Sequence, residues 1–235
     1  MDKAGKLAFA LLGSRLILFL FFQVLIALFT ASWKLSEHYW LLSATLTNIV
    51  SIAILFFLFK TEGRVYLSLF KISKSDFKND ILIFLGLTIL IGPIVFFSGY
   101  FLSLLLWNDS NVPTQMMFGP INKYWVYILL IAFPITITFA ELATYFGYIM
   151  PKLKEQLKRK WLAIFLPVLF LSIQHCTLPF IPDINFIVYR SLVFLPFALL
   201  IGISIYHRPS LFIYFAILHG IMDFGAALMF LIEIK

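Results

Sequence analysis

Seven long apolar segments constrain this chain more than any other feature of its sequence. Each is long enough to cross a hydrocarbon core about 30 Å thick as a tilted helix. Hydrophobic residues make up 62% of the chain and charged residues only 12%, whereas about a quarter of the residues of a soluble domain are charged. We therefore predict an all-α fold, a polytopic transmembrane helical bundle of about seven spans. The segments cover about residues 16–33, 39–59, 81–107, 124–150, 161–180, 184–206 and 211–234.

The basic residues predict how this bundle is oriented. They gather on alternate sides of the apolar segments, so by the positive-inside rule the N-terminus is cytoplasmic and the C-terminus lies outside. The net charge of +7 then reflects membrane topology, and no nucleic-acid motif accompanies it. The basic groups are Lys3, Lys6 and Arg15; Lys60, Arg64, Lys71, Lys74 and Lys78; Lys152, Lys154, Lys158, Arg159 and Lys160; and Arg208.

Some stretches allow two interpretations. The first segment could be a signal peptide, since small residues follow it at 30–32, but its apolar run reaches 18 residues and we expect a retained helix. Residues 60–80 could be a short interfacial amphipathic helix or a solvated basic loop. The helix breakers Gly92-Pro93 and Pro134 predict kinks in the third and fourth segments.

Five ionisable residues, Arg190 among them, lie well inside the apolar segments, and the other four share one depth. Glu141 is nine residues from Met150, where its apolar run stops, so at the helical rise it lies about 13 Å deep. A charge at that depth costs roughly 2.5 kcal/mol or more, so a partner or a function is expected. His175, His219 and Asp223 lie about 12 to 21 Å deep by the same count. We expect all four side chains to converge on one cavity.

Each of these residues also has a structural explanation. His175 or His219 alone could simply bond a backbone carbonyl, and Glu141 could lie in the membrane uncharged. Asp223 could be neutralised by Arg190, which lies on the sixth segment within reach of a long side chain. The coincidence of four such residues at one depth favours a shared polar site.

Few reactions fit a glutamate, two histidines and an aspartate around a small wet cavity. A carboxylate and an imidazole can together remove a proton from water. A second imidazole, with a hydrogen-bonding group one turn further on, can stabilise an oxyanion. The same residue types could hold zinc with an open position for water, although no HExxH spacing is present. The single cysteine, Cys176, excludes an intrachain disulfide.

Three short motifs contain these residues. Residues 141–151 read ELATYFGYIMP, residues 170–175 read FLSIQH and residues 219–223 read HGIMD. In order and spacing they resemble the motifs of the CAAX prenyl endopeptidase and bacteriocin-processing (CPBP, or Abi) intramembrane proteases. The first motif of that family is commonly EExxxRGxLxP, the second has an aromatic residue upstream of a histidine, and the third is a histidine followed four residues later by Asn or Asp.

This resemblance covers roughly residues 122–234 and implies a helical intramembrane endopeptidase. It implies that Glu141 and His175 activate water while His219 and Asp223 stabilise the oxyanion. The single membrane domain, 1–235, would then comprise N-terminal helices over 1–121 and a CPBP-like catalytic core over 122–235.

Two positions depart from the first motif. The second glutamate is Leu142 and the arginine is Phe146, so the ion pair expected beside the site is absent. Losing both charges together leaves neither unpaired. We hypothesise that Arg190 partly substitutes by projecting into the cavity from the sixth helix.

The favoured function is an intramembrane endopeptidase that hydrolyses a peptide bond of a membrane-associated or prenylated peptide or protein. Its expected partners are membrane lipid and a peptide substrate; no cofactor is expected, with a divalent metal such as zinc left open. We expect it in a bacterial cell membrane. The alternative is a noncatalytic relative, such as a bacteriocin-immunity factor or scaffold. A proton-coupled carrier ranks third, because the number of spans is odd and no inverted repeat is visible.

Overall fold

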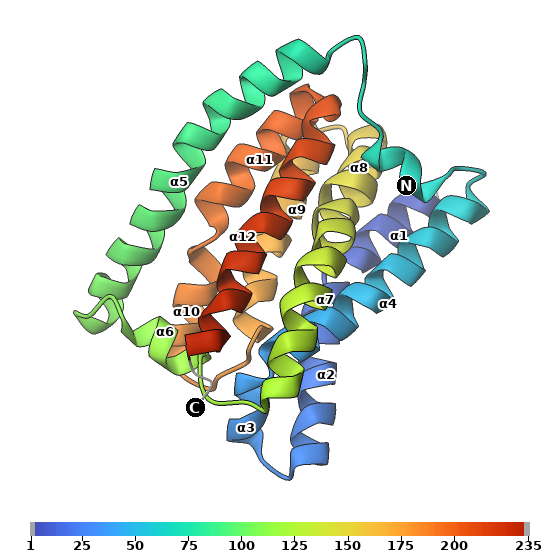
Figure 1. Ribbon diagram of the computed structural model, residues 1–235. Coiled ribbons are helices and arrows are strands. Elements are labelled where there is room, and N and C mark those ends of the chain that lie inside the picture. Colours follow the sequence, from blue (N-terminus) through green and yellow to red (C-terminus); the bar gives the residue numbers. More distant parts are fainter. Residues whose placement is uncertain (1–2, 233–235) are drawn as a thin grey trace.

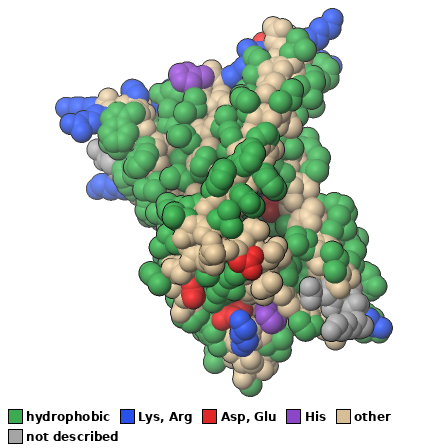
Figure 2. All heavy atoms as spheres, turned by 90° about the vertical axis from the view of Figure 1, so that its left-hand side faces the viewer, with side chains coloured by type: hydrophobic (Ala, Val, Ile, Leu, Met, Phe, Trp, Pro, Cys, Tyr) green, Lys and Arg blue, Asp and Glu red, His purple; other side chains and the backbone are tan. Residues whose placement is uncertain are grey.

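The computed structural model describes residues 3–232, and within that range it contains twelve α-helices and no β-strand (Figure 1). Six helical stretches are long and apolar enough to cross a membrane, and a bent pair at the N-terminus makes up to seven. The predicted all-α polytopic bundle is confirmed. Figure 2 shows hydrophobic side chains over much of one face, with more basic side chains at its upper end than at its lower end. Residues 233 and 234 of the last predicted segment lie outside the described range.

The first span differs from the prediction. It consists of α1 (Lys3–Leu12) and α2 (Ser14–Thr30), and their axes meet at an angle of 41° around Gly13. Arg15, which we expected to flank the start of this span, therefore lies in the first turn of α2 and is fully buried. The error arose because the apolar run was counted from residue 16, whereas α1 adds a helix before the arginine.

The remaining elements follow the predicted order, with breaks in different places. Helices α5 and α7 continue through Pro93 and Pro134, since a membrane helix tolerates proline where neighbours satisfy its backbone. A π-helical turn, η2 (Ala143–Ile149), begins two residues after Glu141. The other elements are α3 (Trp33–His38), α4 (Trp40–Thr61), η1 (Tyr66–Phe70), α5 (Phe77–Trp107), α6 (Val112–Met117), α7 (Lys123–Leu142), α8 (Met150–Gln156), α9 (Lys160–Ile173), η3 (Gln174–Thr177), α10 (Ile184–Leu192), α11 (Leu195–His207), η4 (Pro209–Leu211) and α12 (Phe212–Ile232).

Helix α7 is the centre of the bundle. It packs against α12 on one side and α4 on the other (Figure 1), and every residue from 140 to 150 is buried. The contact with α12 is close because Gly220 has no side chain: a Cβ atom there would lie 2.0 Å from Thr138 Oγ1 and 3.0 Å from the Pro134 carbonyl oxygen. Small residues let membrane helices approach in this way, and the approach brings the polar residues of α12 next to Glu141.

The basic stretch between α4 and α5 is tied into the bundle. Only Tyr66–Phe70 of it is helical, as the short 3₁₀ turn η1. The Tyr66 hydroxyl donates a hydrogen bond to the backbone carbonyl of Phe139, and the Leu69 side chain lies against Gly147. An amphipathic helix over residues 60–80 is therefore not formed, and η1 covers the end of α7 instead.

Helix α5 lies at the edge of the bundle (Figure 1) and is mostly exposed. It contacts α6, α10, α11 and η4, and Phe84 also packs against Tyr214 and Phe215 of α12. The first turn is held by Asp80, which is fully buried and accepts hydrogen bonds from Arg208 Nε at 2.5 Å and Ser210 Oγ at 2.9 Å. The last turn is held by Ser103, whose hydroxyl donates to the Asp109 carbonyl at 2.7 Å. Polar contacts thus fasten both ends of a helix that has few neighbours between them.

Replacing Asp80 with alanine should loosen the first turn of α5. We expect the loss of the two charge-assisted hydrogen bonds to cost about 2 kcal/mol, or roughly 4–8 °C in Tm. Tm can be measured by the loss of helical circular dichroism on heating. The matched control is Asp76→Ala, because Asp76 is half exposed and lies 3.9 Å from Arg208; equal losses for the two variants would contradict the assignment.

Candidate active site

The four residues predicted to converge all line one cavity. It has a volume of about 280 Å³, and Arg190 lines it as well. Glu141 lies at the end of α7, His175 in η3, and the other two on α12. The remaining walls are apolar, formed by side chains such as Val95 of α5 and Phe197 of α11. A larger groove of about 660 Å³ between α5 and the α10–α11 corner holds Ser98 as its only polar side chain among the described residues, so it offers no group for acid–base chemistry.

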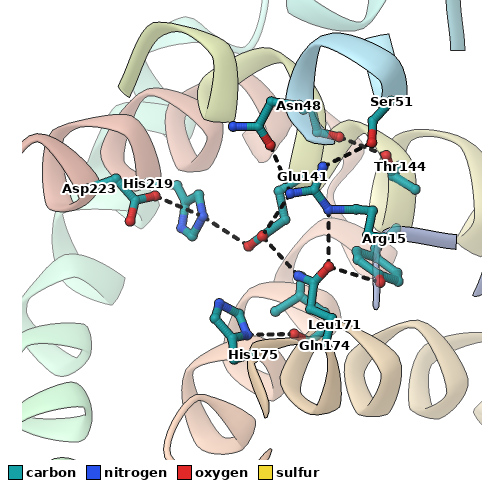
Figure 3. Close-up of polar contacts among 12 residues, drawn as sticks. Arg15, Asn48, Ser51, Glu141, Thr144, Leu171, Gln174, His175, His219 and Asp223 are labelled. Atoms are coloured by element: carbon teal, nitrogen blue, oxygen red, sulfur yellow. Dashed lines mark hydrogen bonds and ion pairs between the residues drawn. The ribbon is translucent and has the colours of Figure 1, made fainter. Parts of the chain in front are cut away.

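His219 connects the two carboxylates of the site (Figure 3). Its Nε2 atom lies 3.0 Å from Glu141 Oε1 and 3.2 Å from Asp223 Oδ2. Asp223 reaches this atom because it is four residues further along α12, on the same helix face. The imidazole stacks on Phe197 with ring centroids 6.0 Å apart, and its buried Nδ1 atom has no hydrogen-bond partner among the described residues. One ring nitrogen is thus shared between two acidic groups.

The second oxygen of Glu141 faces away from His219. Oε2 accepts a hydrogen bond from Gln174 Nε2 at 2.8 Å and another from Arg15 Nη2 at 3.3 Å (Figure 3). Glu141 and Arg15 therefore form an ion pair in which both side chains are almost fully buried. A buried carboxylate needs such compensation, and the arginine that supplies it comes from the first span.

His175 lies beside this pair with a defined tautomer. Its Nδ1 atom is 2.9 Å from the Leu171 carbonyl oxygen, and because a carbonyl only accepts, Nδ1 carries the proton. In the neutral ring, Nε2 is then a free acceptor, and Figure 3 shows it directed to the side where Glu141 and His219 lie. The backbone bond that we considered as an alternative for this histidine is present, and the ring nevertheless lines the cavity.

Arg190 does not neutralise Asp223 in the way we considered. Its Nε atom donates to the His175 carbonyl at 3.3 Å and Nη2 donates to the Leu178 carbonyl at 2.6 Å. The guanidinium also lies over the Phe194 ring, 5.1 Å from its centroid. Arg190 thus lines the cavity while holding the turn that carries His175, and the guanidinium in contact with Glu141 belongs to Arg15.

The two motif departures are accommodated by apolar packing. Leu142 and Phe146 are both buried, and Phe146 lies against Gly202 of α11. Neither position leaves a polar group unpaired, as expected from the joint loss of both charges. Cys176 is a partly exposed free thiol.

Sequence reasoning missed the residues that hold Glu141. We counted Arg15 as a flanking charge, and Gln174, Asn48 and Ser51 were not considered. A signal was available: Gln174 directly precedes His175, and Asn48 and Ser51 are polar positions three apart in an apolar segment. Polar residues inside a span usually face other polar groups.

A metal site is a separate question from the acid–base groups. Among residues 3–232, no three His, Cys, Asp or Glu side chains are arranged to hold a metal ion. The candidate ligands of the cavity are engaged with protein groups: Glu141 with Arg15 and Gln174, and His219 with both carboxylates.

No protein-family model, curated protein or solved structure matches the chain.

Proposed function

We propose that the chain is an intramembrane endopeptidase of the CPBP type. Glu141 and His175 activate a water molecule, while His219 and Asp223 stabilise the oxyanion formed from the attacked peptide carbonyl. The observation that carries this proposal is the position of His219 Nε2, 3.0 Å from Glu141 Oε1 on the wall of a cavity that His175 and Asp223 also line. A base and a hydrogen-bond donor are thus adjacent at one buried opening.

The reaction balances with these groups alone. Glu141 takes a proton from water, and the resulting hydroxide oxygen bonds to the carbonyl carbon of the peptide. The free Nε2 of His175 accepts a hydrogen bond that orients the water. As the C–N bond breaks, the proton passes to the amide nitrogen, which leaves as an amine and gives a new carboxyl group.

His219 must change partners during this reaction. The one proton on Nε2 cannot be donated in good geometry to two carboxylates and an oxyanion at once. Glu141 Oε1 lies 3.0 Å and Asp223 Oδ2 3.2 Å from this atom, so the substrate oxygen must replace one of these two contacts.

A substrate of matching chemistry is a membrane-associated peptide. The cavity walls are apolar around a few polar groups, which suits an extended apolar segment with one exposed peptide bond. A prenylated C-terminus, a peptide precursor or a membrane-helix segment of another protein each meets this requirement.

The proposal can be tested by placing the purified protein in liposomes with a library of hydrophobic and farnesylated peptides and identifying new termini by mass spectrometry. We expect cleavage by the wild type, and a rate about 10²- to 10³-fold lower for His219→Gln, as for loss of an oxyanion donor. His207→Gln is the matched control, because His207 is exposed at the end of α11, and it should leave the rate unchanged. A folded wild-type protein that cleaves no peptide of the library would contradict the proposal.

A noncatalytic relative is the second candidate, and one observation favours it. Oε2 of Glu141 is already engaged with Arg15 and Gln174, while His219 Nε2 faces carboxylates on two sides. A scaffold or immunity factor could use this network only to hold its helices together. Such a protein would keep its cellular effect when Glu141 and His175 are both replaced.

A further inference from the structure

Arg15 lies at the centre of a buried polar network that joins the N-terminal helices to the candidate site. Its side chain is fully buried, and each guanidinium nitrogen has a different partner (Figure 3). Nε donates to Gln174 Oε1 at 3.0 Å, Nη1 to Ser51 Oγ at 3.2 Å, and Nη2 to Asn48 Oδ1 at 2.8 Å as well as to Glu141. The arginine therefore links α2, α4, α7 and η3.

The contacts with Gln174 and Glu141 form a closed ring. Arg15 Nε donates to Gln174 Oε1, and Gln174 Nε2 donates to Glu141 Oε2. Arg15 Nη2 donates to the same carboxylate oxygen, which closes the ring. The Tyr145 hydroxyl, 3.1 Å from Gln174 Oε1, fixes the amide further. The two oxygens of Glu141 consequently have different environments: Oε2 is held by the protein, and only Oε1 faces His219 and the cavity.

We infer that Arg15 is the positioning residue of Glu141. It holds the carboxylate by Oε2 so that Oε1 is the oxygen presented to water and to His219. This inference rests on the proposed function for its catalytic meaning. A planar guanidinium is required, because three nitrogens in a fixed plane must meet separate acceptors, and a lysine would supply only a point charge.

Charge balance around the cavity agrees with this role. The charged and titratable groups that face His219 and Glu141 are Arg15 from α2, Asp223 from α12, His175 from η3 and Arg190 from α10. Two arginines thus accompany two carboxylates. Arg190 donates to backbone carbonyls, so Arg15 is the one in contact with a carboxylate at the site.

Kinetics of arginine variants test the positioning role. Arg15→Gln should lower kcat about 100-fold with KM changed less than twofold, because a small misplacement of a catalytic group has an effect of that size. Arg15→Lys should keep most of the Tm yet still lower kcat about tenfold. The matched control is Arg159→Gln, since Arg159 is exposed beside α9, and it should behave as wild type. Unchanged kcat for Arg15→Gln, or full activity for Arg15→Lys, would overturn the inference.

A second measurement does not depend on proteolysis. In protein labelled with ¹⁵N-histidine, Arg15→Gln should shift the His219 ring resonances, assigned by their loss in His219→Gln, because Glu141 Oε1 changes position. The His207 resonances should stay where they are. Unchanged His219 resonances would overturn the inference, whereas a wild type without peptidase activity but with the expected shift would overturn only the proposed function.

If Arg15→Gln folds poorly, the inference can still be tested by comparing the Tm of this variant with the Tm of a double variant. Loss of Arg15 alone leaves a buried carboxylate without its partner, which is strongly destabilising. The double variant Arg15→Gln/Glu141→Gln removes both charges and should regain most of the lost Tm. A double variant as unstable as the sum of the two single changes would show that the pair is not coupled and would contradict the inference.

Discussion

Replacing Glu141 with glutamine is expected to reduce peptide hydrolysis by at least roughly 10³-fold, because the variant lacks the base that takes the proton from water. Glutamine keeps the volume of the side chain and can still accept from Gln174 and Arg15 through its amide oxygen. The fold should therefore persist by helical circular dichroism, with a lowered Tm because the buried Arg15 loses its counter-ion. The initial rate on a peptide cleaved by the wild type is the measurement.

The matched control for this variant is Glu155→Gln. Glu155 is an exposed glutamate on α8, and its replacement should leave the rate unchanged. Residual hydrolysis above about a tenth of the wild-type rate in Glu141→Gln would assign the reaction to other residues. An unaltered cellular effect in Glu141→Gln/His175→Asn would favour the noncatalytic alternative.

Replacing Gly220 with valine should be the most damaging change to the fold. A Cβ atom at this position would lie 2.0 Å from Thr138 Oγ1, so α12 would have to move away from α7. We expect a loss of about 3 kcal/mol or more, as for severe overpacking, which corresponds to roughly 6–12 °C in Tm. Because His219 precedes Gly220, separating the helices should also move its imidazole away from Glu141 and lower activity.

Gly225→Val provides the control for this prediction. Gly225 lies on the same helix, and a Cβ atom there would meet no other atom within 4 Å. The two variants therefore add the same side chain to α12 at a crowded and an open position. Equal Tm values would mean that the close contact between α7 and α12 contributes little to stability.

The fold class could be predicted from the sequence because the bilayer leaves few alternatives. Apolar segments of sufficient length must be helical to satisfy their backbone hydrogen bonds in lipid, so composition and segment length were enough. The position of the breaks was not predictable in the same way. Pro134 lies inside the continuous helix α7, whereas the π-helical turn begins at Ala143 and was not predicted.

The residues of the candidate site could be predicted where an ionisable side chain lies inside an apolar segment, because burying it there costs free energy. Glu141, His175, His219 and Asp223 were identified by depth alone, and all four line one cavity. Arg15 was not found because depth was counted from the start of an apolar run, and an arginine before that run counts as outside it. Its burial depends on the preceding helix α1 and on acceptors from α4 and η3, which are tertiary contacts that no local pattern encodes.

Between its two fastened ends, α5 separates the cavity from the surrounding lipid, because most of its surface is exposed. This helix has 31 residues, about 46 Å at the helical rise, whereas the hydrocarbon core is about 30 Å thick. A helix longer than the local core accommodates the mismatch by tilting or by thickening the bilayer around it, so the lipid thickness acts on α5. Val95, midway along α5, lines the cavity. A change in lipid chain length should therefore change the width of the cavity by moving α5, although α5 provides none of the acid–base groups of the site.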